Sequence, residues 1–112
     1  VKLPTHSFTA TEATFILLQA APGQEKNVEN LLIAAAEIVE KTEPKTLFWA
    51  GLKLDDNTYA IFDTFTDESG RKAHFEGKVA EALNKKAATL IKDGWDNGVL
   101  PNIHNYKIVT AK

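Results

Sequence analysis

The feature that most constrains the fold of this chain is a hydrophobic pattern that alternates between two periods along 112 residues. Short runs rich in β-branched and aromatic residues give way twice to stretches whose apolar residues recur every three or four positions. The first pattern is typical of strands and the second of amphipathic helices. Strands are predicted at 14–20, 46–54, 58–65 and 103–109, and helices at 24–41 and from Thr66 to about Ile91.

Turn and breaker residues separate these segments. Pro22-Gly23 ends the first strand, and Pro44 prevents the first helix from continuing. Asp55-Asp56-Asn57 lies between the second and third strands, and short polar side chains of this kind hydrogen-bond back to the backbone in turns. The two strands therefore form an antiparallel hairpin.

The start of the second helix carries negative charge. Thr66 is the expected N-cap, and Asp67 and Glu68 lie where a helix has its positive end. Gly77 is expected to weaken or bend this helix, because glycine costs about 1 kcal/mol relative to alanine in a helix interior.

The predicted order is β-α-β-β-α-β, the split βαβ arrangement of an α+β, ferredoxin-like sandwich. Such a fold has one antiparallel sheet with both helices on one face. Residues 13–112 are expected to form this single domain, because about 100 to 150 residues is the usual domain length. Residues 1–12 are expected to be a loose N-terminal arm or a short edge strand.

The third strand is apolar on both of its faces. Tyr59, Ile61 and Phe65 alternate with Ala60 and Phe62. If the face without helices were solvated, one of the two alternating sets should be polar. An exposed apolar face of this size indicates an interface, so we expect a homodimer through the open sheet faces. The alternative is that the N-terminal arm folds across the open face.

Composition and charge argue against several functions. The formal charge is −2 and no basic run alternates with aromatic residues, so nucleic acid is not an expected partner. No stretch of about 18 apolar residues is present, so no membrane span is expected. The absence of cysteine excludes disulfides and thiolate chemistry, and it fits a cytoplasmic location. His6, His74 and His104 lack ligand spacing, so no metal site is expected.

Three segments together resemble one protein family. The first is the run 61–74, Ile-Phe-Asp-Thr-Phe-Thr-Asp-Glu-Ser-Gly-Arg-Lys-Ala-His, in which a strand ends in an acidic and an aromatic residue before an acidic helix start and an Ala-His pair. The second is Pro-Lys-Thr-Leu-Phe-Trp at 44–49, and the third is the Pro-Gly turn at 22–23. This order and spacing resembles the antibiotic biosynthesis monooxygenase-like family over residues 13–110.

The resemblance implies a dimeric α+β barrel in which two open sheet faces enclose the cavities. Characterised members of that family oxidise phenolic or quinol-type substrates with molecular oxygen, without metal or flavin, so no cofactor is expected. A related branch degrades haem with an asparagine on the first strand. Here that strand carries Gln19, and this departure argues against haem chemistry.

His74 is the first candidate catalytic residue. An imidazole on the second helix could accept a phenol proton, because its ordinary pKa lies near 6.5. The alternative is a structural histidine bonded to a backbone carbonyl or to Asp63.

Asp63 is the second candidate catalytic residue. It shares a strand face with Ile61 and Phe65, and the resemblance implies that this face lines the barrel interior. A carboxylate in an apolar cavity needs a partner or a raised pKa. The alternative is a buried carboxylate held by His74, Arg71 or a neighbouring strand.

Four aromatic residues are candidates for binding a flat ring substrate, although a single aromatic residue of this kind more often belongs to the core: Trp49, Tyr59, Phe65 and Tyr106. The face on which Trp49 lies is left open, because a one-residue change in strand pairing would reverse it.

Three functions remain open from the sequence. The first is a cofactor-independent monooxygenase that acts on a small phenolic or quinol-type aromatic. The second is a non-catalytic homodimer of the same fold that binds such a molecule. The third is a structural dimer whose cavity is filled by its own side chains.

Overall fold

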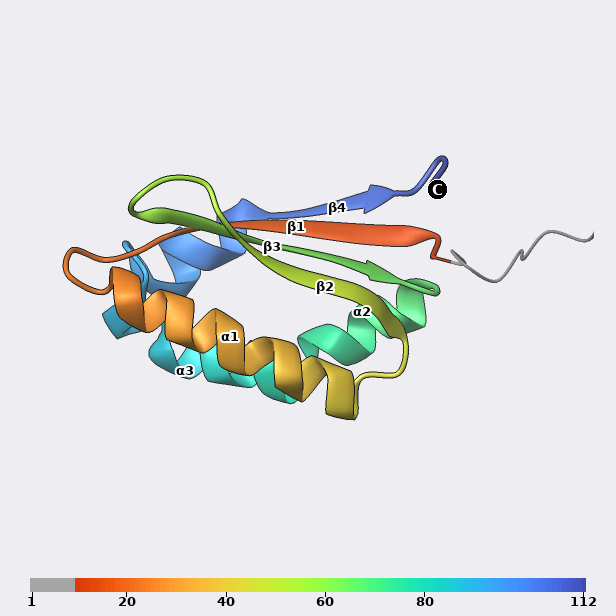
Figure 1. Cartoon of the computed structure of the whole chain (residues 1–112), viewed down its shortest axis with the longest axis horizontal. Helices are drawn as coiled ribbons and strands as arrows, with labels where there is room; N and C mark the ends of the chain where they lie inside the picture. The colour runs from red at the N-terminus through yellow and green to blue at the C-terminus, as the bar shows by residue number, and fades with distance from the viewer. Residues whose placement is uncertain (1–9) are drawn as a thin grey trace, which may run out of the picture.

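The computed structural model describes residues 10–112, which form one sheet and a set of helices (Figure 1). The elements are, in order, β1 Glu12–Gln19, α1 Glu25–Thr42, β2 Thr46–Lys53, β3 Thr58–Phe65, α2 Glu68–Phe75, α3 Lys78–Leu90, a π-helical turn Gly94–Val99, a 3-10 turn Leu100–Asn102 and β4 Ile103–Lys107.

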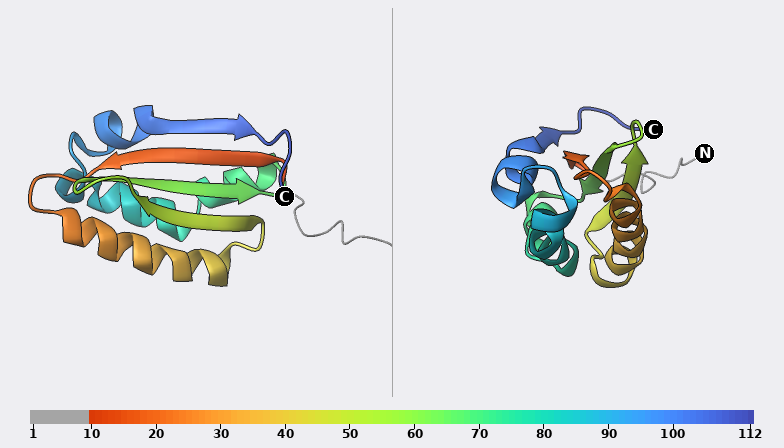
Figure 2. Two further views of the ribbon diagram at one scale, coloured as in Figure 1. Left: turned by 45° about the horizontal axis from the view of Figure 1, so that its top comes forward. Right: turned by 90° about the vertical axis from the view of Figure 1, so that its left-hand side faces the viewer.

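The four strands form one antiparallel sheet in the order β2-β3-β1-β4. The three helices lie on one face of this sheet, and the other face is left uncovered (Figures 1 and 2). This arrangement confirms the predicted α+β, ferredoxin-like fold. Most of the predicted N-terminal arm, and with it the suggestion that the arm crosses the open face, lies outside the described residues. Glu12 is the first residue of β1.

The second predicted helix is in fact two helices. α2 ends at Phe75, and Gly77 has extended backbone angles and serves as the N-cap of α3. The predicted N-cap, Thr66, is wrong by one residue. Asp67 has the extended backbone of an N-cap, and its side chain accepts a hydrogen bond from the Gly70 N–H at 3.1 Å. Capping therefore goes to the charged side chain of Asp67.

The main core lies between the helices and one face of the sheet. Ile16 and Leu18 of β1 are paired with Ile61 and Tyr59 of β3 on this face. They pack against apolar side chains of α1 and α3, namely Val28, Leu32, Leu83, Ala87 and Leu90. The helix-facing residues of β3 are therefore its odd-numbered ones.

A bulge in β2 decides the direction of Trp49. Thr46 pairs with Phe65, but Phe48 pairs with Thr64, so Leu47 is the extra residue. Trp49 consequently lies opposite Asp63, on the face that the helices cover. The question that the sequence left open is thereby answered.

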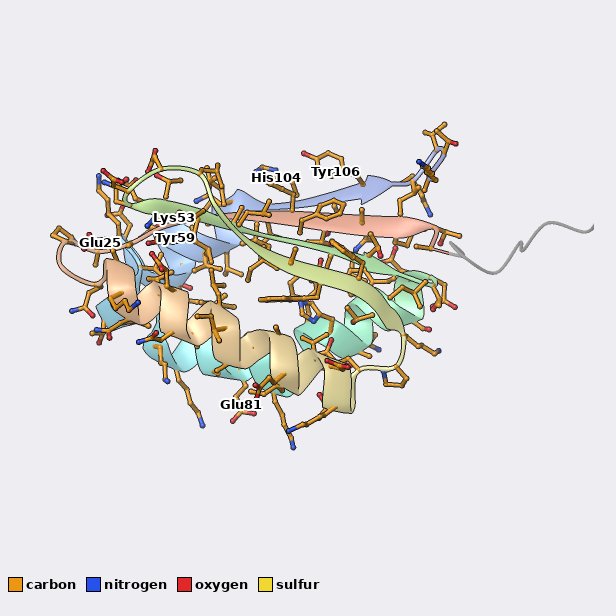
Figure 3. All side chains as sticks on the ribbon, in the orientation of Figure 1. Glu25, Lys53, Tyr59, Glu81, His104 and Tyr106 are labelled. Carbon is orange, nitrogen blue, oxygen red and sulfur yellow. The ribbon has the colours of Figure 1, made fainter. Side chains whose placement is uncertain are left out.

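The uncovered face of the sheet is rich in large apolar side chains. Phe48 of β2 and Phe62 of β3 have ring centroids 6.1 Å apart, and Phe48 is 50% exposed. Together with residues 107–111, these rings line a hollow of about 450 Å³. His104 and Tyr106 of β4 are stacked on the same side of the sheet, away from the helices (Figure 3).

No helix among residues 10–112 is both long enough and apolar enough to cross a membrane.

Candidate functional site

One imidazole joins two carboxylates between the sheet and the helices. His74 Nδ1 lies 2.7 Å from Glu43 Oε1, and His74 Nε2 lies 3.0 Å from Asp63 Oδ2. Asp63 comes from β3, His74 from α2, and Glu43 from the residues just after α1. We call these three residues the Glu-His-Asp cluster.

The local sequence directs each of these side chains inward. Gly70, Arg71 and His74 are the buried residues of α2, and their three- and four-residue spacing forms one helix face. Asp63 follows the alternation of β3 and lies beside the core positions. Glu43 is held in place because its Oε1 also accepts a hydrogen bond from the Thr46 hydroxyl at 2.9 Å.

The Glu-His-Asp cluster is almost completely removed from solvent. Asp63 is 0% exposed, His74 is 3% exposed and Glu43 is 9% exposed. Among the described residues, Glu43 Oε2 and both oxygens of Asp63 lack a hydrogen bond of good geometry. The contact between His74 Nε2 and Asp63 is therefore an ion pair by distance rather than a well-aligned hydrogen bond.

The pKa values of two members are shifted in the folded protein. Burial raises the pKa of Asp63, because a carboxylate is poorly stabilised away from water. Burial alone would lower the pKa of His74, but the close contact with the Asp63 carboxylate, together with the charge and hydrogen bond of Glu43, outweighs it and raises the pKa. With the imidazole protonated and both carboxylates ionised, the cluster would carry one net negative charge and could take up one further proton.

Two aromatic rings enclose the imidazole. The Phe65 ring centroid lies 5.5 Å from that of His74, and the Phe75 centroid lies 5.4 Å from it. These rings limit the approach of water, so the charges of the cluster interact in a medium less polar than water.

A pocket of about 340 Å³ adjoins the cluster. Its wall is mainly apolar and is formed by the turn between α1 and β2 together with α2 and the start of α3. Glu43 is the cluster member that lines this pocket. The volume is at the lower end of the range of about 300–1,000 Å³ typical of small-molecule sites.

Arg71 forms a separate polar network next to the cluster. Its Nε donates to the Thr14 hydroxyl at 3.1 Å, and its Nη2 donates to the carbonyls of Ala13 and Tyr106 at 2.9 and 3.1 Å. Nη1 lies 2.8 Å from a carboxylate oxygen of Glu68. Arg71 thus connects α2 to β1 and β4.

Two of the predicted aromatic and catalytic residues contact His74, a third is paired with one of these two, and two lie elsewhere. Asp63 and Phe65 contact it, and Trp49 is paired with Asp63 across the sheet. Tyr59 lies elsewhere in the core, and its hydroxyl donates to Glu29 at 2.7 Å; Figure 3 shows it beside Lys53 and Glu25.

Tyr106 is 56% exposed and lies on the open face, so the structure brings it to neither the cluster nor the pocket.

The predicted facing of Asp63 and Phe65 is wrong. Both were expected on the open sheet face, inside a barrel made by two sheets, and both instead face the helices. The alternation of a strand shows which residues share a face, but it does not show which face the helices cover.

Glu43 is a member of the cluster that sequence reasoning missed. A signal for it does exist, because a glutamate at the C-terminal end of a helix meets the negative end of the helix dipole. A carboxylate in that position, immediately before Pro44, is favoured by a compensating partner.

The three groups contact one another through opposite sides of a single imidazole ring. Among the residues that the structure describes, no group of three or more histidine, aspartate or glutamate side chains is arranged to hold a metal ion.

The fold and the buried cluster define a ferredoxin-like α+β protein with a histidine–carboxylate site under its sheet. A solved structure from Nitrosomonas europaea, NE2512, a protein of unknown function, shares 36% sequence identity. The alignment covers 93% of this chain and 94% of that chain, with a TM-score of 0.83. The chain belongs to the same family as NE2512.

More distant structures share the fold. A candidate antibiotic biosynthesis monooxygenase from Caulobacter crescentus has a TM-score of 0.73 at 14% identity, covering 92% of this chain and 93% of its own. Another, from Chloroflexus aurantiacus, has a TM-score of 0.65 at 16% identity, covering 92% and 97%. The predicted resemblance is confirmed at the level of fold. No protein-family model and no curated protein sequence matches the chain.

Proposed function

We propose that the protein is a cofactor-independent monooxygenase that acts on a small phenolic or quinol-type aromatic compound. The observation that carries this proposal is the Glu-His-Asp cluster, a buried group able to take up a proton, beside a mainly apolar pocket of about 340 Å³. The fold shared with candidate antibiotic biosynthesis monooxygenases gives further support. Likeness of fold does not by itself carry function, so the proposal depends on the site.

The proposed reaction takes its electrons from the substrate. Loss of the O–H proton to the cluster leaves a phenolate, which gives one electron to molecular oxygen. The two radicals then combine at a ring carbon that bears hydrogen, and a C–O bond forms. When the O–O bond breaks and that C–H proton leaves, one oxygen atom remains as a carbonyl and the other departs as water. The protein supplies deprotonation and a water-poor site.

Oxygen uptake tests this function. Purified protein is mixed with a panel of hydroquinones and anthrones, and consumption is measured against the buffer rate for each compound. We expect the wild type to exceed that rate and His74→Gln to lose about 100-fold or more, since a positioned acid–base group contributes about 10²–10⁴-fold. His104→Gln, on the open face, serves as the matched control. If the wild type consumes oxygen no faster than buffer, the enzyme proposal fails.

One observation favours a second candidate, a binding protein without catalysis. Both ring nitrogens of His74 already contact carboxylates, so the imidazole has no free nitrogen for a substrate. A cluster in which both ring nitrogens are occupied can still fix the shape of the pocket in which a ligand binds. This candidate predicts that an aromatic ligand binds without any consumption of oxygen.

We also infer that the protein works as a homodimer through its uncovered sheet face. The support is the exposure of large apolar side chains on that face, including Phe48 and Leu52. Apolar surface is stabilised by about 25 cal/mol for each Å² that is removed from water, so a second copy is a favourable cover.

A further inference from the structure

One oxygen atom of the cluster is left without a partner beside the pocket. Glu43 Oε1 is fully engaged, since it contacts His74 Nδ1 at 2.7 Å and accepts from Thr46 at 2.9 Å. Glu43 Oε2 is buried and has no hydrogen-bond partner among the described residues. A buried carboxylate oxygen without a donor is costly, because it has lost its hydration without replacement.

The pocket beside this oxygen exists because small residues line it. Gly70, Ala73 and Gly77 form one wall, at the junction of α2 and α3. A Cβ atom at Gly77 would lie 3.2 Å from Glu43 Oε2 and 3.2 Å from the Ala73 carbonyl oxygen. Any side chain at this position would crowd Oε2, so the glycine allows the junction of α2 and α3 to pass close to the unpaired oxygen.

We propose that Glu43 Oε2 is the atom that accepts the proton of a bound aromatic hydroxyl, and that Gly77 leaves this oxygen undisturbed by a side chain. The inference rests on the proposed function and deepens it. It names Glu43 as the catalytic residue, with His74 and Asp63 as positioning residues behind it.

The proton transfer is balanced within the site. The substrate O–H bond breaks, an Oε2–H bond forms, and the electron pair stays on the phenolate oxygen. The charge of the cluster rises by one unit, and the ligand takes on one negative charge. Lys45 and Lys78 line the same pocket and bring positive charge to the side of the phenolate.

The same geometry defines the class of ligand. Oε2 can only accept a hydrogen bond while the carboxylate is ionised, so the buried end of the ligand must be a donor. The rest of the pocket is mainly apolar, with Pro44 and Ala73 in its wall, and it suits the body of an aromatic ring. A hydroxyl on a small ring satisfies both requirements, whereas the corresponding methyl ether does not.

A matched pair of chromogenic ligands tests the contact. 4-Nitrophenol and 4-nitroanisole differ by a methyl group on the oxygen, and binding of each is measured by absorbance titration at a pH where the phenol is neutral. We expect the wild type to bind the phenol at least about 10-fold more tightly, because hydrogen bonds to charged groups contribute about 1.5–3 kcal/mol. The absorption band of the bound phenol should move to longer wavelength as its proton is shared with the carboxylate.

Two variants should remove this preference. Glu43→Gln keeps the size of the side chain but removes its charge, and it should lower phenol affinity about 10-fold while leaving 4-nitroanisole unchanged. Gly77→Ala should weaken phenol binding by a similar factor, because the new methyl group would lie 3.2 Å from Oε2 and displace the carboxylate. Gly51→Ala is the control, since its Cβ would lie 3.2 Å from Leu32, away from the pocket. Urea titration of each variant verifies folding.

The outcomes separate this inference from the proposed function. Equal affinity of the wild type for both ligands, absence of phenol binding, or full phenol affinity in both variants would overturn the role of Glu43. Wild-type oxygen uptake in Glu43→Gln and Gly77→Ala would also overturn it, while leaving the monooxygenase proposal intact. The expected binding pattern without any oxygen uptake would support the Glu43 contact and contradict the monooxygenase proposal.

Discussion

At the scale of single residues, His74 is the side chain on which two buried carboxylates depend. Removing it would leave the carboxyl groups of Asp63 and Glu43 without their shared partner in a site that water scarcely reaches. Breaking a buried ion pair in this way is far more costly than replacing the whole set by apolar groups. The stability of the fold and the proposed chemistry therefore depend on the same imidazole.

We predict that His74→Ala lowers the free energy of unfolding by about 3–5 kcal/mol, the usual cost of removing one partner of a buried pair. His104→Ala, which removes an imidazole from the open face, should cost less than about 1 kcal/mol. Urea denaturation followed by circular dichroism measures both. Equal losses in the two variants would mean that the ion pairs of His74 contribute nothing to stability.

The pH dependence of stability is a second prediction at this scale. The raised pKa of His74 means that the folded state holds this proton to a higher pH than the unfolded chain does. The stabilisation is complete below the unfolded pKa of about 6.5 and is lost as the pH rises through the folded value. The raised pKa of Asp63 acts in the same direction, from about 3.8 upward.

The free energy of unfolding should therefore fall as the pH is raised from 6.5, and urea titrations between about pH 6 and pH 9 would measure the slope. In His74→Gln the fall above pH 6.5 should be smaller than in the wild type. A wild-type stability that is constant or rises over this range contradicts the ion pairing of His74.

At the scale of elements, the start of α2 depends on one carboxylate. Asp67 accepts a hydrogen bond from the Gly70 N–H, whereas the Thr66 hydroxyl has no partner among the described residues. Since α2 carries both Arg71 and His74, this cap holds the helix that supplies two buried polar networks.

Asp67→Ala should lower the free energy of unfolding by about 0.5–2 kcal/mol, the usual cost of losing an N-cap side chain. Thr66→Ala should change it little, because no hydrogen bond is lost. Thermal or urea unfolding of the two variants provides the comparison. A larger loss of unfolding free energy for Thr66→Ala would indicate that Thr66 is the N-cap, as the sequence predicted.

The elements were more predictable than the contacts between them. The strand 58–65 was predicted with the bounds that the structure has, since its composition and the Asp55-Asp56-Asn57 turn are local signals. Thr66 and Asp67 are both good capping residues, so local chemistry did not separate them.

Glu43 is 31 residues from His74 in sequence, and their contact depends on how α1 ends and how α2 packs. Local patterns carry no information about such a distant meeting. The contact of Asp63 with His74 was foreseen as one alternative, because a buried carboxylate needs a partner and few cations lie nearby in sequence.

At the scale of the whole molecule, the two faces of the sheet have different properties. One face is covered by helices and contains the core and the cluster, and the other exposes aromatic and aliphatic side chains. A single exposed apolar side chain is ordinary, but a contiguous patch of them indicates an interaction surface.

Phe48→Asp should convert the proposed homodimer to a monomer, because a charge would be buried without a partner at the interface. The control is Ile33→Asp, which places the same charge on the outer surface of α1, where the side chain is 66% exposed. Sedimentation velocity over a range of concentrations distinguishes the two states. A wild-type protein that stays monomeric at high concentration would contradict the dimer.

The separation of the Glu-His-Asp cluster from the uncovered face has a consequence for cooperativity. The pocket beside Glu43 is formed by the α1–β2 turn, α2 and α3. A second copy would pack on the opposite side of the sheet from these helices. Ligand binding and subunit association can influence each other only if both change the state of the same structural element. Here the ligand would contact no residue of that interface. Each subunit should therefore fill independently, with a Hill coefficient of about one, and dilution should separate the subunits without changing the affinity of either.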